Sequence, residues 1–239
     1  MTKHPIDTAN ANLSWLKIAA ITAMLWDHIA YAISIHNPTA LNTWYIWART
    51  PGRICMPIFA FLIAWNYRFN TRHPLAYVRR LALFAICCEP LYQYYFGYPG
   101  NAFIPLALGA WLAYYHDQQN NQPATRWIYT MCLSLTGAAL IATLCHAPDI
   151  LAQTLATWAI SRYLLEPTKP KWLIAAGCCL PLFNGQTWQF YAAYAITIAA
   201  ITAACTTNRK LTNAKLPKWL AYGFYPAHLI TLSLIFGGA

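Results

Sequence analysis

The sequence predicts an all-α protein, a polytopic helical bundle embedded in a membrane, with about nine transmembrane helices and a cytoplasmic N-terminus. Three observations lead to this prediction. Hydrophobic residues make up 59% of the 239 residues and charged residues only 9%. This fraction of charged residues is too low for an ordinary soluble fold. Apolar runs recur along the whole chain. Basic residues gather in alternate connections between those runs.

The predicted helices are successive apolar runs, each bounded by a polar segment or by Pro or Gly. The first run reaches the length of about 20 residues that a simple membrane crossing needs. Several later runs are shorter, and we expect those helices to be tilted, kinked or partly inserted and packed within protein. Because no repeat or linker interrupts the series, residues 1–239 are interpreted as a single membrane-embedded domain. In chain order the predicted spans are Leu13–Ile35, Thr50–Tyr67, Tyr77–Tyr95, Ala102–Tyr115, Trp127–Cys145, Ile150–Leu165, Trp172–Phe183, Trp188–Cys205 and Trp219–Phe236.

The distribution of charge predicts the orientation of the bundle. With nine spans, the N-terminal side holds fourteen of the sixteen Lys and Arg residues, and only Arg49 and Arg53 lie on the opposite side. Cytoplasmic segments carry this excess of cations, so the N-terminus is predicted to be cytoplasmic. The net charge of +10 is thereby accounted for, and the chain has no nucleic-acid motif, so no nucleic-acid partner is expected. The eight cysteines lack zinc-binding spacing, so no metal site is expected.

Ionisable residues inside the predicted spans are the candidates for function, because each costs about 2.5–3.5 kcal/mol at a helix centre. About 22 Å of helix separates His28 from Leu13, which places His28 past the midplane toward the outside. Arg53 follows the outer end of the second span at a similar height, so an ion pair between Asp27 and Arg53 is predicted. The candidates are Asp27, His28, Arg53, Glu89 and His228.

The candidates differ in how far the pattern favours function. His28 is either a chemical group or a structural donor to a neighbouring helix, and its place beside Asp27 favours the first. Arg53 either locks helices together or takes part in the chemistry. Lys17 and His28 share one helical face with Ile21 and Met24, so a substrate along that face would meet a cation at one end and an imidazole at the other.

Two prolines mark the remaining candidates. Glu89 precedes Pro90 and is interpreted as the end of a broken helix near the middle of the membrane, where it either packs in protonated form or functions. Pro226 is expected to kink the last helix near Tyr222, with His228 close to mid-depth. His228 is left open between a structural and a functional role.

Four segments, taken together and in this order, resemble the TraX family of bacterial inner-membrane proteins. The name-giving member of that family is associated with N-terminal acetylation of F-type conjugative pilin. The family also resembles the wider membrane acyltransferases that carry a histidine on the first helix and transfer an acyl group from cytoplasmic acyl-CoA to an acceptor at the outer face. The segments are LKIAAITAMLWDHIA at Leu16–Ala30, GRICMPIFAFLIAWNYRFNTRH at Gly52–His73, YVRRLALFAI at Tyr77–Ile86 and YGFYPAHL at Tyr222–Leu229.

The resemblance implies that His28 is the catalytic histidine, with Asp27, Arg53 and His228 at matching motif positions. Acetyl transfer needs a base for the proton of the nucleophile and a cation or dipole for the developing oxyanion. An imidazole, with an ordinary pKa of about 6.5, suits the first task if burial keeps it neutral. The anionic end of acetyl-CoA needs cytoplasmic cations. The residues expected to bind it are Lys17, Arg79, Arg80, Arg209 and Lys210.

The leading hypothesis is therefore an acetyl-CoA-dependent N- or O-acetyltransferase that acts directly on pilin or a related envelope acceptor. Three other functions remain open. One is an O-acetyltransferase of a cell-envelope glycan. Another is a proton-coupled transporter with Asp27, His28 and Glu89 as a relay. The third is a non-catalytic pilus assembly factor that holds pilin in the membrane.

Overall fold

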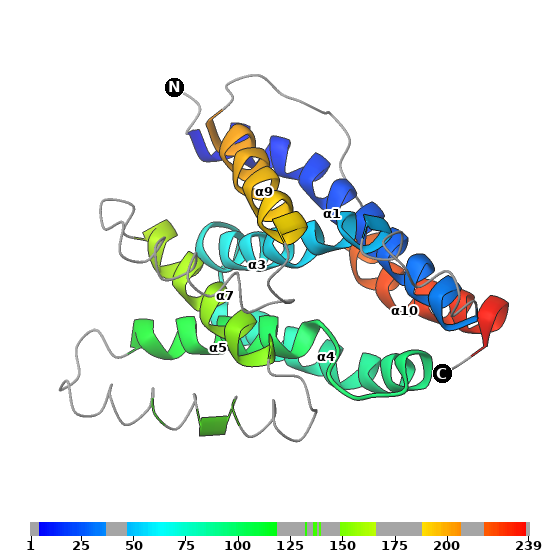
Figure 1. The fold of residues 1–239 in the computed structure, drawn as a ribbon. Coiled ribbons are helices and arrows are strands. Elements are labelled where there is room, and N and C mark those ends of the chain that lie inside the picture. Colours follow the sequence, from blue (N-terminus) through cyan, green and yellow to red (C-terminus); the bar gives the residue numbers. More distant parts are fainter. Residues whose placement is uncertain are drawn as a thin grey trace. The chain divides into compact units, whose positions relative to one another are not determined.

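The computed structural model describes residues 5–36, 47–118, 149–165, 188–206 and 218–237, with a few single positions between 132 and 139. Almost all of these residues are helical, and no β-strand occurs among them. Figure 1 shows the helices in the colours of their order along the chain. The prediction of an all-α protein is confirmed for the part of the chain that the structure describes.

Seven of the nine predicted spans coincide with helices, and six of them agree in their bounds to within about three residues, whereas α1 begins at Pro5, eight residues before the predicted Leu13. Trp127–Cys145 lies largely, and Trp172–Phe183 entirely, outside the described residues. The π-helical segment η3 directly follows α3. The helices are α1 (Pro5–His36), η2 (Pro51–Ile54), α3 (Cys55–Trp65), η3 (Asn66–Asn70), α4 (Pro74–Phe96), α5 (Phe103–Gln118), α7 (Asp149–Leu165), α9 (Trp188–Thr206) and α10 (Lys218–Phe236).

Among the described residues, one helical segment is both long and apolar enough to cross a membrane. This is Leu13–Ile35 within α1, which has the bounds predicted for the first span. Two shorter apolar segments, Ala195–Ala204 and Tyr222–Phe236, lie within α9 and α10. The helical nature of the predicted spans is therefore confirmed where it is described, whereas the count of nine crossings stays a prediction.

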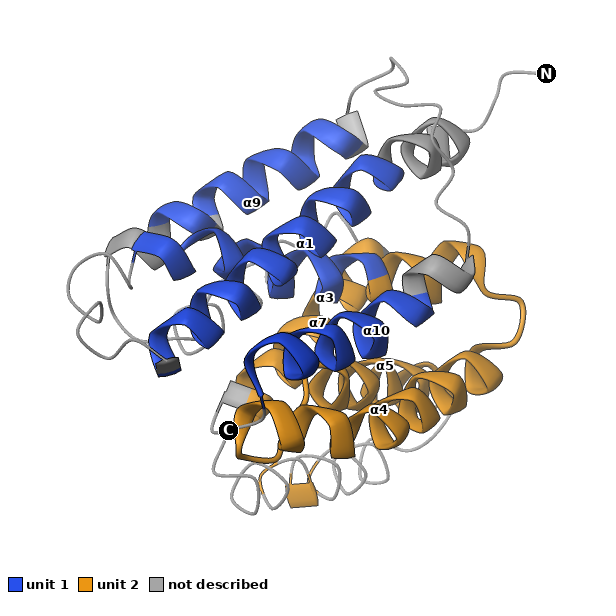
Figure 2. Ribbon diagram, turned by 90° about the vertical axis from the view of Figure 1, so that its right-hand side faces the viewer, with its two compact units in different colours: residues 1–62, 186–239 blue, residues 63–185 orange. Residues whose placement is uncertain are grey.

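The chain divides into two compact units, which Figure 2 shows in different colours. Unit 1 consists of Met1–Leu62 and Gln186–Ala239, so it joins the first and last parts of the sequence. Unit 2 is the middle part, Ile63–Gly185. The interpretation of residues 1–239 as one domain stays a prediction, and each unit is described by itself.

In unit 1, helix α1 contacts η2, α9 and α10. In Figure 1, α9 runs opposite to α1 and α10 runs in the same direction as α1. These directions are those that the predicted topology requires of its first, eighth and ninth helices. The packed face of α1 is a stripe with the i, i+4 spacing of a helix buried along its length. The buried residues of this stripe are Leu16, Ala20, Met24, His28 and Ala32.

In unit 2, helices α4 and α5 are consecutive and pack against each other. Pro74 is the first residue of α4, where a backbone N–H has no acceptor within the helix, so the absence of an N–H in proline costs no hydrogen bond. Gly97 closes α4 with a φ of 76°, a left-handed conformation in which its N–H donates to the Gln93 carbonyl at 2.9 Å. The start and end of this helix are thus set by residues with the required backbone freedom.

The Glu89 carboxylate fastens the connection between α4 and α5. It accepts hydrogen bonds from the Gly100 N–H at 2.6 Å, the Asn101 N–H at 3.1 Å and the Asn101 Nδ2 at 2.5 Å. The prediction of a broken helix end at Glu89 is wrong, since α4 continues through Pro90 to Phe96. A proline removes one hydrogen bond from the ladder, and tertiary contacts can hold the two halves of such a helix together.

Helices α5 and α7 approach each other closely at Gly109. A Cβ atom at this position would lie 2.5 Å from Thr157 Cβ and 2.8 Å from the Thr154 carbonyl oxygen, so a larger residue does not fit. The two threonine hydroxyls turn back to their own helix, where they donate to the carbonyls of Ile150 and Gln153 at 2.8 and 2.9 Å. Their hydrogen bonds are thereby satisfied without a partner on α5.

Candidate functional site

Two histidines from distant parts of the sequence meet in unit 1. Nδ1 of His28 on α1 lies 2.7 Å from Nε2 of His228 on α10, and the two rings are inclined by only 18°. Both residues are buried, with 8% and 5% of their surface exposed. The structure therefore brings together two of the residues that the sequence singles out separately.

The hydrogen-bond partners assign the tautomers of this pair. Nδ1 of His228 lies 2.9 Å from the carbonyl oxygen of Phe224, which only accepts, so His228 Nδ1 carries a proton. In the neutral ring its Nε2 then has a lone pair and accepts from His28 Nδ1–H. Nε2 of His28 is consequently the nitrogen that keeps its lone pair. The chain of hydrogen bonds makes that atom the basic end of the pair.

Asp27, adjacent to His28, is bound by Arg49 through two hydrogen bonds. Arg49 Nε donates to Oδ1 at 2.9 Å and Nη2 donates to Oδ2 at 2.8 Å, a bidentate geometry that is the strongest available to this pair. The prediction of Arg53 as the partner is wrong. The chain is already helical at residues 47–49, and Arg49, one turn before Arg53, is the guanidinium that faces α1.

Gly52 and Trp26 hold the segment before α3 against α1. A Cβ atom on Gly52 would lie 2.2 Å from Asp27 Cβ and 2.6 Å from its Oδ1, so only glycine permits this approach. Trp26 Nε1 donates to the Ala48 carbonyl at 2.7 Å. Arg53, in η2 and partly buried, acts electrostatically on the Asp27 carboxylate. All four residues predicted as catalytic are thus in unit 1.

The cations predicted to bind the acyl donor are not gathered in one place. Lys17 is partly buried on α1, with about 16 Å of helix between it and His28. Arg79 and Arg80 are exposed near the start of α4 in unit 2. Arg209 and Lys210 lie outside the described residues. The assignment of these five residues to acetyl-CoA stays a prediction.

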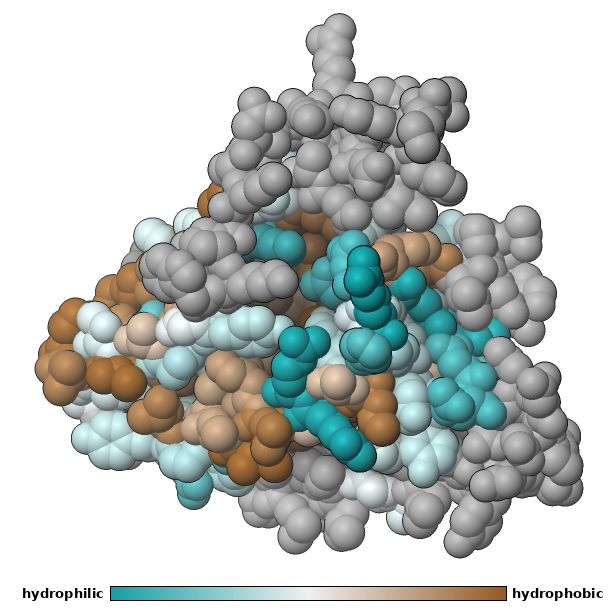
Figure 3. All heavy atoms as spheres, turned by 180° about the vertical axis from the view of Figure 1, so that it is seen from behind, coloured by the Kyte–Doolittle hydropathy of each residue, from teal (hydrophilic) through white to brown (hydrophobic). Residues whose placement is uncertain are grey.

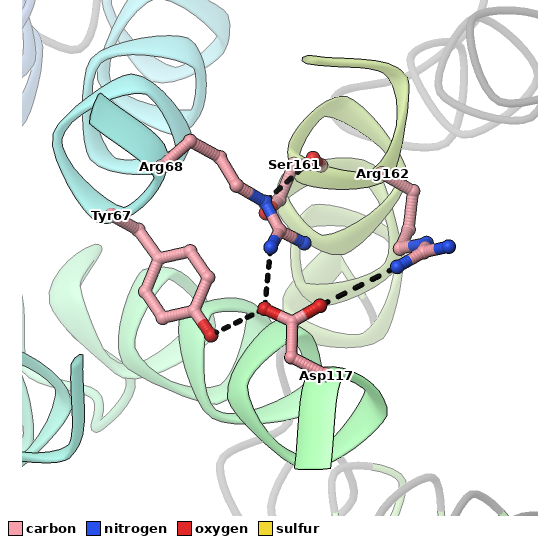
Figure 4. A network of polar contacts seen from close by, with 5 residues as sticks. All are labelled: Tyr67, Arg68, Asp117, Ser161 and Arg162. Carbon is pink, nitrogen blue, oxygen red and sulfur yellow. Dashed lines mark hydrogen bonds and ion pairs between the residues drawn. The ribbon is translucent and has the colours of Figure 1, made fainter. Parts of the chain in front are cut away.

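A second polar cluster, which sequence reasoning missed, lies in unit 2 (Figure 4). Asp117 near the end of α5 accepts from the Tyr67 hydroxyl at 2.8 Å and from Arg68 Nη1, and it pairs with Arg162 Nη1 at 3.4 Å. Nε of Arg68 donates to the carbonyl and hydroxyl oxygens of Ser161 at 2.9 and 2.8 Å. Figure 4 shows both guanidinium groups turned toward the carboxylate.

This cluster joins three helix ends. Tyr67 and Arg68 belong to η3, which follows α3, and Arg162 lies in the last turn of α7. In the predicted topology all three ends are cytoplasmic, and Arg68 and Arg162 are among the cations that define that side. The signal that could have revealed the cluster is the single acidic residue of α5, which lies just past the apolar run.

Large hydrophobic side chains are exposed on four helices, and Figure 3 shows hydrophobic residues on the outer surface of one face. Large exposed hydrophobic side chains of this kind are suited to contact with lipid or a partner. The exposed residues are Ile18, Trp26 and Ile35 on α1, Leu83, Ile86 and Tyr94 on α4, Ile196 and Ile198 on α9, and Ile230, Leu234 and Ile235 on α10.

Comparison with protein families gives one match. A family model described as TraX protein matches residues 12–236, which is nearly the whole chain and includes both polar clusters. No curated protein and no solved structure matches the chain. The match extends well beyond the four segments that carry the resemblance in the sequence.

Proposed function

This chain belongs to the TraX family, and we propose that it is a multi-pass protein of the bacterial inner membrane that transfers an acetyl group from acetyl-CoA to the N-terminus of pilin or a related acceptor at the outer face. Family membership suggests a pilus-related role. The observation that carries the proposed chemistry is the buried pair of His28 and His228, whose hydrogen bonds leave a basic nitrogen at His28 Nε2.

Several structural features support the membrane setting. Exposed large hydrophobic residues on α1, α4, α9 and α10 suit contact with lipid. Threonine hydroxyls on α7, α9 and α10 donate to carbonyls of their own helices, as a lipid environment requires. The opposite directions of α1 and α9 and the common direction of α1 and α10 agree with alternating passes.

The proposed reaction joins an amine to the acetyl group of the thioester. The amine nitrogen attacks the carbonyl carbon, a C–N bond forms and the C–S bond breaks, so coenzyme A leaves as a thiolate. His28 Nε2 removes the proton from the attacking nitrogen, and that proton returns to the departing sulfur. The balanced products are the acetylated amine and free coenzyme A, with no covalent enzyme intermediate.

His228 acts on this reaction through His28, as a positioning residue. Its Nε2 accepts the His28 Nδ1–H, which fixes the tautomer of His28 with the lone pair on its Nε2. Asp27 and Arg49 hold the adjoining segment, and Arg53 on the next turn supplies positive charge near the site for the developing oxyanion.

The test is acetylation of a pilin N-terminus, followed by mass spectrometry, in membranes that contain the protein and acetyl-CoA. We expect His28→Ala to abolish acetylation, because it removes His28 Nε2, the nitrogen that is proposed to take the proton from the amine. His28→Ala must insert to the same level as the wild type for the comparison to count. If His28→Ala acetylates pilin at the rate of the wild type, the proposal is wrong.

The role of His228 is tested by two variants of similar size. In His228→Gln the side-chain oxygen can still accept from His28 Nδ1–H, so partial activity is expected, with kcat lowered and KM for pilin unchanged. In His228→Leu the acceptor is lost and activity is expected to be much lower. Equal activity of the two variants would show that His228 only fills space.

A further inference from the structure

Arg68 has a donor that no other described residue uses. Its Nε is bound to Ser161 and its Nη1 to Asp117, whereas Nη2 is buried and has no hydrogen-bond partner. The side chain is only 8% exposed, so water does not readily satisfy this nitrogen. An unsatisfied nitrogen on a buried charged group is costly, so its presence in a native structure calls for an explanation, and a bound ligand is one such explanation.

The neighbours of Arg68 suit an anion with several oxygens. Arg162 supplies a second guanidinium group on the same carboxylate, whereas the single O–H of Tyr67 is already donated to Asp117. Asp117 and Ser161 hold the guanidinium of Arg68 in a fixed orientation, so the remaining nitrogen is aimed before a ligand arrives. Planar guanidinium groups held in this way bind phosphate oxygens in preference to single-point anions.

The site also lies where a phosphorylated donor would approach. Asp117, the most exposed member of the ion pairs at 24%, links the cluster to the surface. In the predicted topology this surface is cytoplasmic, which is the compartment that supplies acetyl-CoA. The π-helical turn that carries Tyr67 and Arg68 is a local departure from α-helix of a kind common at functional sites.

We propose that Arg68, with Arg162, binds a phosphate group of coenzyme A at the joint end of η3, α5 and α7. This inference rests on the proposed acetyltransferase function and names the residues that recognise its donor. The phosphate of an anionic lipid headgroup has the same chemistry, and the test therefore separates the two sources.

The test measures binding of labelled coenzyme A to the full-length protein in nanodiscs. The discs contain phosphatidylcholine alone or phosphatidylcholine with phosphatidylglycerol. Arg68→Lys keeps a cation that can pair with Asp117, and it removes the second terminal nitrogen together with the Nε donor to Ser161. We expect a loss of coenzyme A affinity of about tenfold or more in both lipids, the effect of one charge-assisted hydrogen bond. Arg72→Gln removes an exposed cation nearby and is expected to change the affinity less than twofold.

Each outcome decides between the proposals. His28→Ala should bind coenzyme A normally while losing acetylation, which separates binding from chemistry. Unchanged affinity in Arg68→Lys, with acetylation intact in the wild type, would overturn the inference and leave the proposed function standing. Absence of coenzyme A binding by the wild type would overturn both. An effect of Arg68→Lys seen only with phosphatidylglycerol would overturn the assignment to coenzyme A and identify a lipid headgroup site.

Discussion

The two polar clusters differ in how their charges are matched. In unit 1, Asp27 is paired with Arg49 in a bidentate contact, and the two side chains are 13% and 16% exposed. In unit 2, Asp117 is shared by Arg68 and Arg162, and Arg68 retains an unused terminal nitrogen. In a bidentate pair both oxygens of the carboxylate bind one guanidinium group, so the pair fixes the two segments that carry it. A shared carboxylate positions two cations and leaves donor capacity for a ligand.

The largest effect is expected from breaking the matched pair. Asp27→Leu leaves the partly buried Arg49 without the carboxylate that binds it in two places, and we expect a loss of about 3 kcal/mol in the free energy of unfolding. The measurement is denaturant-induced unfolding of the purified protein in detergent micelles.

A double variant provides the control for this prediction. Asp27→Leu with Arg49→Leu removes both charges, so most of the lost stability is expected to return. If the double variant is as unstable as Asp27→Leu, the unpaired charge of Arg49 is not the cause of the lost stability.

A smaller effect is expected at the contact that places the matched pair. Gly52→Ala puts a Cβ atom 2.2 Å from Asp27 Cβ, so the segment must move away from α1. We expect a loss of about 1–3 kcal/mol in stability and a reduced acetylation rate with an unchanged affinity for coenzyme A. Gly223→Ala serves as the control, because a Cβ atom at that position meets nothing within 4 Å. Equal losses in the two variants would show that the contact with Asp27 is not the cause.

The shared carboxylate is expected to behave differently from the matched one. Asp117→Asn keeps the shape and a hydrogen-bond acceptor but removes the negative charge between Arg68 and Arg162. We expect a modest loss of stability, about 1–3 kcal/mol. The affinity for coenzyme A should rise a few-fold, because the internal competitor for the cations is weakened. Weaker coenzyme A binding in this variant would show that Asp117 is needed mainly to aim the arginines.

The smallest effect is expected at a carboxylate outside both clusters. Glu89→Gln keeps the shape of the side chain at the connection between α4 and α5, but only one of its two terminal atoms can still accept a hydrogen bond from Gly100 or Asn101. We expect about 1 kcal/mol of lost stability and no change in acetylation. A large loss of activity at unchanged stability would instead favour the proton-relay hypothesis, in which Glu89 carries protons.

Much of the helical layout could be predicted from the sequence. Apolar runs bounded by polar segments locate helices well, and the bounds of α9 and α10 differ from the prediction by one residue at most. Helix ends such as Gly97 follow from the conformational freedom of glycine. The sequence also identifies His28 and His228 as candidate functional residues, because ionisable side chains within apolar helices are uncommon and energetically costly.

The partners of these residues could not be predicted. Arg49 lies just before an apolar run and has the sequence environment of a loop residue, although the chain there is already helical. Asp117 follows an apolar run in the same way, and the cations near it have the distribution that topology alone would produce. Contacts such as that between Arg68 and Ser161, 93 positions apart, depend on how helices pack and leave no local pattern.

The histidine pair also has a consequence for the order in which the protein is made. His28 and His228 are 200 positions apart in the chain and lie on its first and last described helices. At a synthesis rate of about 5–20 residues per second, His28 leaves the ribosome roughly 10–40 s before its partner. The pair can form only once the last helix has joined the first, so an unfinished chain lacks it. Under the proposed function, acetylation would therefore begin only in a completed chain.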